Sequence, residues 1–179
     1  MIPSLPRPFR CEGDAALLQR NTAMHPIGII HSPFRNLSDM PIQPKGAAAQ
    51  EGEVEVFADF AEGLLDLDGF SHIYLLYRFH QAQRTELRVV PFMDSVARGV
   101  FATRSPLRPN HIGLSIVELV KVEANVVTIR GVDVLDGTPL LDIKPYIAAF
   151  DEVRDSLSGW MQASREEVSA ARSDRRFIG

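Results

Sequence analysis

The feature that most constrains the fold is a succession of short segments in which apolar and polar residues alternate. EGEVEVF (51–57), SHIYLLYRFH (71–80) and IGLSIVELVKVE (112–123) each repeat with a period of two. That period is expected of strands that bury one face and expose the other. The remaining strand-like segments are 26–34, 85–92, 125–135 and 139–147.

The connections between these segments are typical of turns rather than of long helices. Residues 123–125 and the DGT sequence at 136–138 indicate tight turns, and DFAEGLLDLDGF indicates a helical turn or two that stop at Gly69. Strands and helices do not alternate as they do in a parallel α/β sheet. We therefore predict a mainly β fold, a small antiparallel β-barrel of about six or seven strands with a few short helices.

The chain is predicted to form one domain with a tail at each end. Its 179 residues are 45% hydrophobic, which is enough for one core. Three early prolines predict a flexible leader at 1–23, and the strand pattern predicts a barrel domain at 24–150. Residues 151–179 carry an apolar stripe at helical spacing and are predicted to form a short helical tail. The stripe consists of Val153, Leu157, Trp160, Ser164, Val168 and Ala171.

Composition excludes several classes of protein. Cys11 is the only cysteine, so an internal disulfide framework is excluded and a reducing, cytoplasmic setting is expected. No apolar run approaches the roughly 18 residues that a membrane span requires. The sequence contains no GxGxxG after a strand and no Walker A, HExxH or GxSxG motif. No metal-ligand spacing is found among the five histidines, and we expect no bound metal.

Charge is distributed unevenly along the chain. The formal net charge is −4, which argues weakly against a nucleic-acid partner. Six of the 19 basic residues are nevertheless arginines between Arg78 and His111. Such a segment can present a local anion-binding face on an acidic protein, and a solvated charged surface is the alternative.

Three polar segments lie beside predicted strands: QPK at 43–45, RSPLRPN at 104–110 and DGTPLLDIKPY at 136–146. Taken singly, each can be a surface turn, a rigid connector or a hairpin. Asp142, Lys144 and Tyr146 stand at alternate positions, so they would share one face of an extended segment. An Asp–Lys–Tyr row is a poor core face and therefore indicates a function.

Four stretches together carry a resemblance to a known family. PIGIIHSPF, GFSHIYLLYRFHQ, GVFATRSPLRPNHIGLSIVEL and DVLDGTPLLDIKPYI resemble, in the same order, the TrmO (TsaA-like) family of S-adenosylmethionine-dependent methyltransferases. The resemblance spans roughly residues 24–150. It implies a small β-barrel and a homodimer with the cofactor site near the dimer interface. It also implies N-methylation of threonylcarbamoyl-adenosine beside the anticodon of tRNA.

The resemblance also implies which residues bind S-adenosylmethionine. These are Gln43, Pro44, Lys45, His80, Gln81, Arg104, Leu114, Leu135, Asp136, Gly137 and Thr138. Methyl transfer needs a cation or backbone N–H groups for the cofactor carboxylate and oxygen atoms near its sulfonium. Arg104 or Lys45 are candidates for the first role, and the Asp136 turn for the second.

The residues that would act on the methyl acceptor are less clearly indicated than those that would bind the cofactor. The candidates for orienting the base and assisting proton loss are Arg108, Asn110, Asp142, Lys144 and Tyr146, with none ranked above the others as a general base. The arginine-rich segment would contact tRNA phosphates. Longer bacterial members of the family carry a further C-terminal domain associated with tRNA binding. Two alternatives therefore stay open: a methyltransferase for a small molecule, and a non-catalytic module that binds S-adenosylmethionine or RNA.

Overall fold

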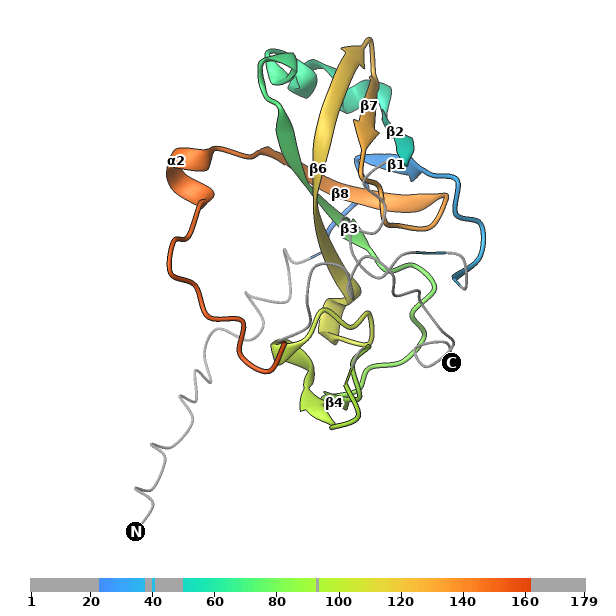
Figure 1. Cartoon of the computed structure of the whole chain (residues 1–179). Helices are drawn as coiled ribbons and strands as arrows, with labels where there is room; N and C mark the ends of the chain where they lie inside the picture. Colours follow the sequence, from blue (N-terminus) through green and yellow to red (C-terminus); the bar gives the residue numbers. More distant parts are fainter. Residues whose placement is uncertain (1–22, 38–39, 41–49, 93, 162–179) are drawn as a thin grey trace, which may run out of the picture.

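The chain folds around a closed six-stranded barrel (Figure 1). The structure, a computed structural model, describes residues 23–37, 40, 50–92 and 94–161. The barrel order is β1-β2-β7-β6-β3-β8, and every neighbouring pair is antiparallel. Its strands are β1 (Gly28–His31), β2 (Glu51–Val56), β3 (His72–Arg78), β6 (Ile112–Glu123), β7 (Val126–Arg130) and β8 (Thr138–Pro145). The mainly β prediction is confirmed.

Alternation along the strands determines what lies inside the barrel. In β3, Ile73, Leu75 and Tyr77 are buried, whereas His72 and Arg78 are exposed. This division agrees with the two faces expected from the sequence. The interior is filled mainly by branched aliphatic side chains, which pack well on pleated strands. Its fully buried members include Ile30, Val54, Val117, Val127, Ile129 and Leu140.

The strand expected at 85–92 is not part of the barrel. Only β4 (Arg88–Val89) is extended and paired, and its partner is β5 (Arg98–Gly99) in a separate two-stranded sheet. This small sheet belongs to the long connection from β3 to β6, which Figure 1 shows at the end of the barrel where β6 begins. Val89, Val100 and Leu107 form a buried cluster of their own there. The apolar residues of 85–92 therefore pack against their own loop. The prediction that they form a barrel strand was wrong.

The strand expected at 125–135 is shorter than predicted. It ends at Arg130, because Gly131 adopts a φ of 90° that a strand does not contain. Val132, Val134 and Leu135 are nevertheless buried, so this connection crosses one end of the barrel as packed chain. The turns expected at 123–125 and 136–138 are both present, and β8 ends at Pro145 as predicted.

Helical structure is short throughout the described part of the chain. The predicted helical turns are η3 (Ala58–Leu64) and η4 (Leu67–Gly69), and the β3–β6 connection adds η5 (Val100–Ala102) and η6 (Pro109–His111). None of the described helices is long and apolar enough to cross a membrane.

The tail differs from its prediction where it is described. The one α-helix there is α2 (Ala148–Asp151), and residues 152–161 form turns and extended chain, with Val153 and Leu157 exposed. Trp160 is held differently, because its indole N–H donates to the Ala102 carbonyl at 2.8 Å. The other half of the predicted stripe, at 162–179, lies outside the described residues.

Candidate functional site

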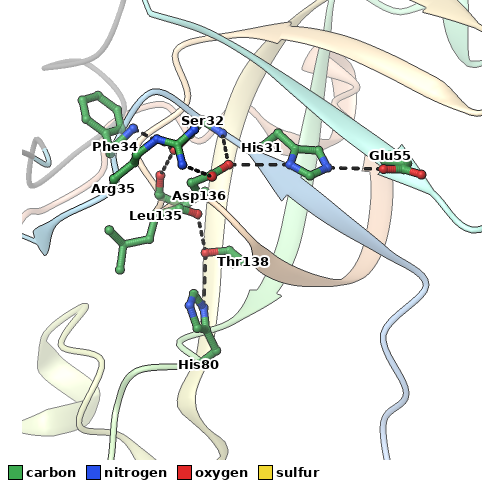
Figure 2. A network of polar contacts seen from close by, with 10 residues as sticks. His31, Ser32, Phe34, Arg35, Glu55, His80, Leu135, Asp136 and Thr138 are labelled. Atoms are coloured by element: carbon green, nitrogen blue, oxygen red, sulfur yellow. Dashed lines mark hydrogen bonds and ion pairs between the residues drawn. The ribbon is translucent and has the colours of Figure 1, made fainter.

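The turn between Leu135 and Thr138 is tied to the end of β1 by a polar network at one end of the barrel (Figure 2). The Ser32 backbone N–H donates to Asp136 Oδ1 at 3.2 Å, and the Asp136 N–H donates to the Phe34 carbonyl at 2.8 Å. The Gly137 N–H donates to the Ile30 carbonyl at 3.0 Å, and Gly137 has a φ of 75°, which favours glycine. The Asp136 carboxylate is thus fixed in place by main chain.

Basic side chains lie on both sides of that carboxylate. His31 Nδ1 is 3.6 Å from Asp136 Oδ1, and Arg35 Nη1 is 3.7 Å from Asp136 Oδ2. His31 also reaches Glu55 Oε2 through Nε2 at 3.4 Å. Neither His31 nor Arg35 was predicted. The sequence feature that could have indicated them is the HSPFR stretch, which directly follows the apolar residues of β1.

His80 reaches the same turn from the end of β3. The Thr138 hydroxyl donates to the Leu135 carbonyl at 2.7 Å and lies 3.5 Å from His80 Nδ1. Burial lowers the pKa of His80, which favours the neutral imidazole at neutral pH. The structure therefore brings together five of the predicted cofactor residues: His80, Leu135, Asp136, Gly137 and Thr138. We call this end of the barrel the barrel mouth. Gln81 follows His80 in an exposed turn.

Arg108 organises the loop that precedes η6. Its Nη2 donates to the Thr103 carbonyl at 2.5 Å and its Nε donates to the Ser105 carbonyl at 3.0 Å. Arg104 is exposed between the buried residues Thr103 and Ser105. The two arginines of this segment therefore differ, because Arg108 donates to carbonyls of its own loop, whereas Arg104 is an exposed residue. Asn110, an exposed residue with a φ of 67°, lies in the turn that leads into β6.

A second polar group lies inside the barrel near the mouth and was not predicted. The Ser115 hydroxyl donates to Asp133 Oδ1 at 2.7 Å, so its oxygen accepts from the Tyr77 hydroxyl at 3.1 Å. Burial raises the pKa of Asp133 to about 6 and also raises the pKa of Tyr77, and the positive charge of Arg104 lowers both. The only sequence signal was a serine at an inward position of β6.

Asp142, Lys144 and Tyr146 share the outer face of the barrel, as their spacing predicted. Asp142 and Lys144 form an ion pair at 2.8 Å, and the Tyr146 ring lies 5.8 Å from the Tyr74 ring. Within one chain, Lys144 in this row is separated from the mouth along β8. Lys144 follows Thr138 by six positions in β8, which is about 20 Å at roughly 3.3 Å per residue.

Leu114 also lies on the outer face, directly opposite Leu76, and is 52% exposed. It therefore does not join the other predicted cofactor residues within one chain. Gln43, Pro44 and Lys45 lie outside the described residues. Within the part of the chain that is described, no three His, Cys, Asp or Glu side chains are grouped as a metal ion would require.

Known proteins share this sequence and fold. The family model described as the tRNA-methyltransferase O N-terminal domain matches residues 29–152. The chain is 53% identical over 153 residues to a "probable S-adenosyl-L-methionine-binding protein" of Pyrococcus abyssi, covering 86% of this chain and 83% of that protein. It is 39% identical over 143 residues to the tRNA (adenine(37)-N6)-methyltransferase of Mus musculus, covering 76% of this chain and 33% of that protein.

The crystal structure of TrmO from Pseudomonas aeruginosa is similar, with a TM-score of 0.65 and 42% identity over 77% of this chain. The matched part is 62% of that solved chain, so the likeness spans less than two thirds of it. The family match, over residues 29–152, covers the barrel mouth and the outer row. The chain therefore belongs to the tRNA-methyltransferase O N-terminal domain family.

Proposed function

We propose that this protein is an S-adenosylmethionine-dependent methyltransferase that methylates N6 of adenosine 37 in tRNA. The observation that carries the proposal is the family match over residues 29–152. The names of the Pyrococcus and mouse relatives support the cofactor and the acceptor, respectively. We further propose that the adenosine carries a threonylcarbamoyl group, as the sequence resemblance implies. The tRNA substrate supports a cytoplasmic location.

The barrel mouth has the charges that this cofactor requires. S-adenosylmethionine, when bound, presents an electrophilic methyl group on a sulfonium cation beside an amino-acid carboxylate. The Asp136 carboxylate and the Leu135 carbonyl are oxygen atoms that favour a cation. Arg35 and Arg104 are cations that favour a carboxylate. The donor set therefore fits the cofactor, and we propose that His80, Gln81 and residues 135–138 bind it together with Arg104, Leu114 and residues 43–45.

Methyl transfer to nitrogen releases a proton from the accepting group, so the acceptor side needs an orienting and proton-accepting group. We propose Asp142, Lys144, Tyr146 and Asn110 for these roles. Arg108 would act indirectly, since its guanidinium donates to the loop carbonyls. The distance of about 20 Å between Lys144 and Thr138 along β8 is too long for direct cooperation within one chain.

A homodimer would resolve this separation, and we propose one. Leu114, Ile116 and Val120 expose 52, 42 and 39% of their surface on the outer face of β6. These apolar side chains lie in the strand next to β3, where Tyr74 and Leu76 share the outer face with them. An exposed apolar strip of this kind favours association with another protein surface. A second copy against this face would bring its own mouth toward the outer row.

The test is a methyl-transfer assay with labelled S-adenosylmethionine. We expect incorporation into tRNA that carries threonylcarbamoyl-adenosine, and none into the same tRNA with guanosine at position 37. Transfer to unmodified tRNA at the same rate would contradict the threonylcarbamoyl requirement. Cofactor binding without tRNA binding would favour a small-molecule methyltransferase. Binding of both without turnover would favour a binding module.

A further inference from the structure

We propose that His31 determines how strongly the barrel mouth prefers a sulfonium over a neutral thioether. The inference rests on the proposed function, in which the Asp136 carboxylate favours the sulfonium of S-adenosylmethionine. S-adenosylhomocysteine, the product of methyl transfer, lacks the methyl group and the positive charge at sulfur. The relative affinity for these two ligands therefore reports the charge that the mouth presents to the sulfur atom.

His31, the last residue of β1, lies between two carboxylates (Figure 2). Its Nδ1 is 3.6 Å from Asp136 Oδ1, and its Nε2 is 3.4 Å from Glu55 Oε2. The β1–β2 register places Glu53 directly opposite His31 and Glu55 opposite Ile29. Two carboxylates therefore contact the imidazole, and a third lies opposite it on the neighbouring strand.

The contact between His31 and Asp136 depends on the protonation of the ring. A neutral imidazole has one N–H and can donate to only one of the two carboxylates, so its other nitrogen faces a carboxylate oxygen with a lone pair. An imidazolium has two N–H groups and a positive charge that attracts both carboxylates. Histidine ordinarily changes between these forms at about pH 6.5, so the charge beside Asp136 changes within the physiological range.

The role of His31 toward Asp136 is electrostatic, because main chain already positions the carboxylate. Asp136 Oδ1 accepts from the Ser32 N–H at 3.2 Å, and the Asp136 N–H donates to the Phe34 carbonyl at 2.8 Å. A protonated His31 adds a positive charge 3.6 Å from that same oxygen. The sulfonium would then meet a partly compensated carboxylate, whereas a neutral His31 leaves the full charge of Asp136 to the ligand.

The cations on this side of the barrel keep their charge between pH 6 and 8. Arg35 Nη1 lies 3.7 Å from Asp136 Oδ2, and a guanidinium does not lose its proton in this range. Lys121, on β6, pairs with Glu123 at 2.8 Å and also remains charged. Both contribute a constant background to the charge at the mouth.

Two other groups near the mouth do respond to pH. Burial lowers the pKa of His80 and raises the pKa of Asp133 to about 6. The contribution of His31 is therefore measured as a difference between the wild type and a variant of His31, in which the contributions of His80 and Asp133 cancel.

The first test measures the coupling of His31 to Asp136 without any ligand. Melting temperatures of the wild type, His31→Gln, Asp136→Asn and the double variant form a double-mutant cycle at pH 6 and at pH 8. At pH 6 we expect the double variant to lose less than the sum of the single losses, and at pH 8 we expect the losses to be closer to additive. The matched control is the same cycle with Lys121→Gln and Glu123→Gln, whose coupling should be equal at both pH values. A coupling of His31 to Asp136 that is equal at both pH values would overturn the inference.

The second test compares the affinities for S-adenosylmethionine and S-adenosylhomocysteine by calorimetry at pH 8 and pH 6. We expect the preference for the sulfonium to fall with pH about two- to fivefold more in the wild type than in His31→Gln, the range for a contact between partly exposed charges. Low ionic strength is used, because the side chains of His31 and Asp136 are 43 and 28% exposed and salt screens them. An equal fall in the two proteins would overturn the inference.

The matched control for the binding test is His72→Gln. His72 is exposed at the opposite end of β3 from His80, and its Nδ1 is 3.0 Å from the Ser71 hydroxyl. We expect this variant to show the same fall in preference as the wild type. A fall that is as small in His72→Gln as in His31→Gln would contradict a specific role of His31.

The two ligands also separate this inference from a structural role and from the proposed function. A structural role of His31 would weaken both ligands equally in His31→Gln and leave their ratio unchanged, which would refute the inference alone. Failure of the wild-type protein to bind either ligand would refute the proposed function and, with it, the preference at the mouth.

Discussion

At the scale of single residues, Gly113 shows how closely the two strands beside the mouth pack. Tyr77 lies opposite Gly113 in the β3–β6 register and its ring covers the glycine. Any side chain at this position would displace the ring and, with it, the hydroxyl that donates to Ser115. The glycine is therefore required by packing, and its backbone conformation is an ordinary one.

We predict that Gly113→Ala lowers the free energy of unfolding by about 1–3 kcal/mol, the usual range for overpacking a tight site. Denaturant unfolding would measure the change. Gly99→Ala is the matched control, because a Cβ at Gly99 meets no atom within 4 Å. Equal stability in the two variants would show that the Tyr77 ring moves aside at little cost.

His80 provides a prediction on pH. Burial lowers its pKa below the ordinary value of 6.5, so as pH falls the unfolded chain binds this proton first. The stability that neutral His80 contributes is present above pH 6.5 and is lost as pH falls below that value. We expect His80→Gln to lose less stability than the wild type between pH 7 and 5 in thermal unfolding. A loss of stability over this range equal to that of the wild type would contradict the prediction.

At the scale of elements, the loop before β6 depends on Arg108. Its guanidinium donates to the carbonyls of Thr103 and Ser105 and thereby replaces the strand pairing that this stretch lacks. Other local bonds in the loop include those from Thr103 Oγ1 to the Val100 carbonyl and from the Leu107 N–H to Ser105 Oγ. The Arg108 side chain therefore joins two carbonyls of this loop to the residue that precedes η6.

Arg108→Ala should therefore increase amide hydrogen exchange at residues 103–107 and lower stability by about 1–3 kcal/mol, since charged donors are lost from carbonyls in a partly buried loop. Arg88→Ala removes an exposed arginine from the neighbouring β4 and should leave exchange in this loop unchanged. Similar exchange in the two variants would contradict the organising role of Arg108.

Along β8, Thr138 lies at the mouth and the proposed acceptor row begins at Asp142. The Asp142–Lys144 ion pair is exposed, so Lys144→Ala should change stability by less than about 1 kcal/mol. We expect this variant to keep its affinity for S-adenosylhomocysteine and to lose methyl-transfer rate. A weakened affinity with an unchanged rate would move Lys144 from the acceptor side to the cofactor side.

At the scale of the whole molecule, the exposed apolar strip on β6 predicts the assembly. Ile116→Glu should convert the proposed dimer into a monomer, because it places a charge in an apolar contact. Light scattering after size exclusion would measure the mass. Leu65→Glu is the control, since Leu65 is 79% exposed beside η3. A wild-type protein that is monomeric at micromolar concentration would refute the dimer.

The barrel could be predicted because its strands carry their own signal. Alternation places Ile73, Leu75 and Tyr77 inside without any knowledge of the neighbouring strands. At 85–92 the predicted barrel strand was wrong, because a short apolar run has the same pattern whether it joins a barrel or packs against a loop. Beyond Arg130 the strand was predicted too long, because Gly131 ends it although the residues that follow are still buried.

The family resemblance named His80, Asp136 and Thr138, which the structure brings together at the mouth. It did not indicate that His31 and Arg35 lie beside Asp136, or that Asp133 bonds to Ser115. His31 and Asp136 lie more than 100 positions apart and meet because β1 pairs with β8 where the barrel closes. Such contacts arise from strand order and register, which alternation along one strand does not encode.

The sequence by itself therefore determined which residues face inward, where the tight turns lie and which family the chain resembles, because these depend on neighbours along the chain. Only the tertiary structure decided that Ser115 joins Tyr77 to Asp133, that Arg108 binds its own loop, and that Lys144 lies far from Thr138. The physical reason is that closure of the barrel sets which side chains share an end, a face or the interior, and burial then sets the pKa values of Asp133 and His80.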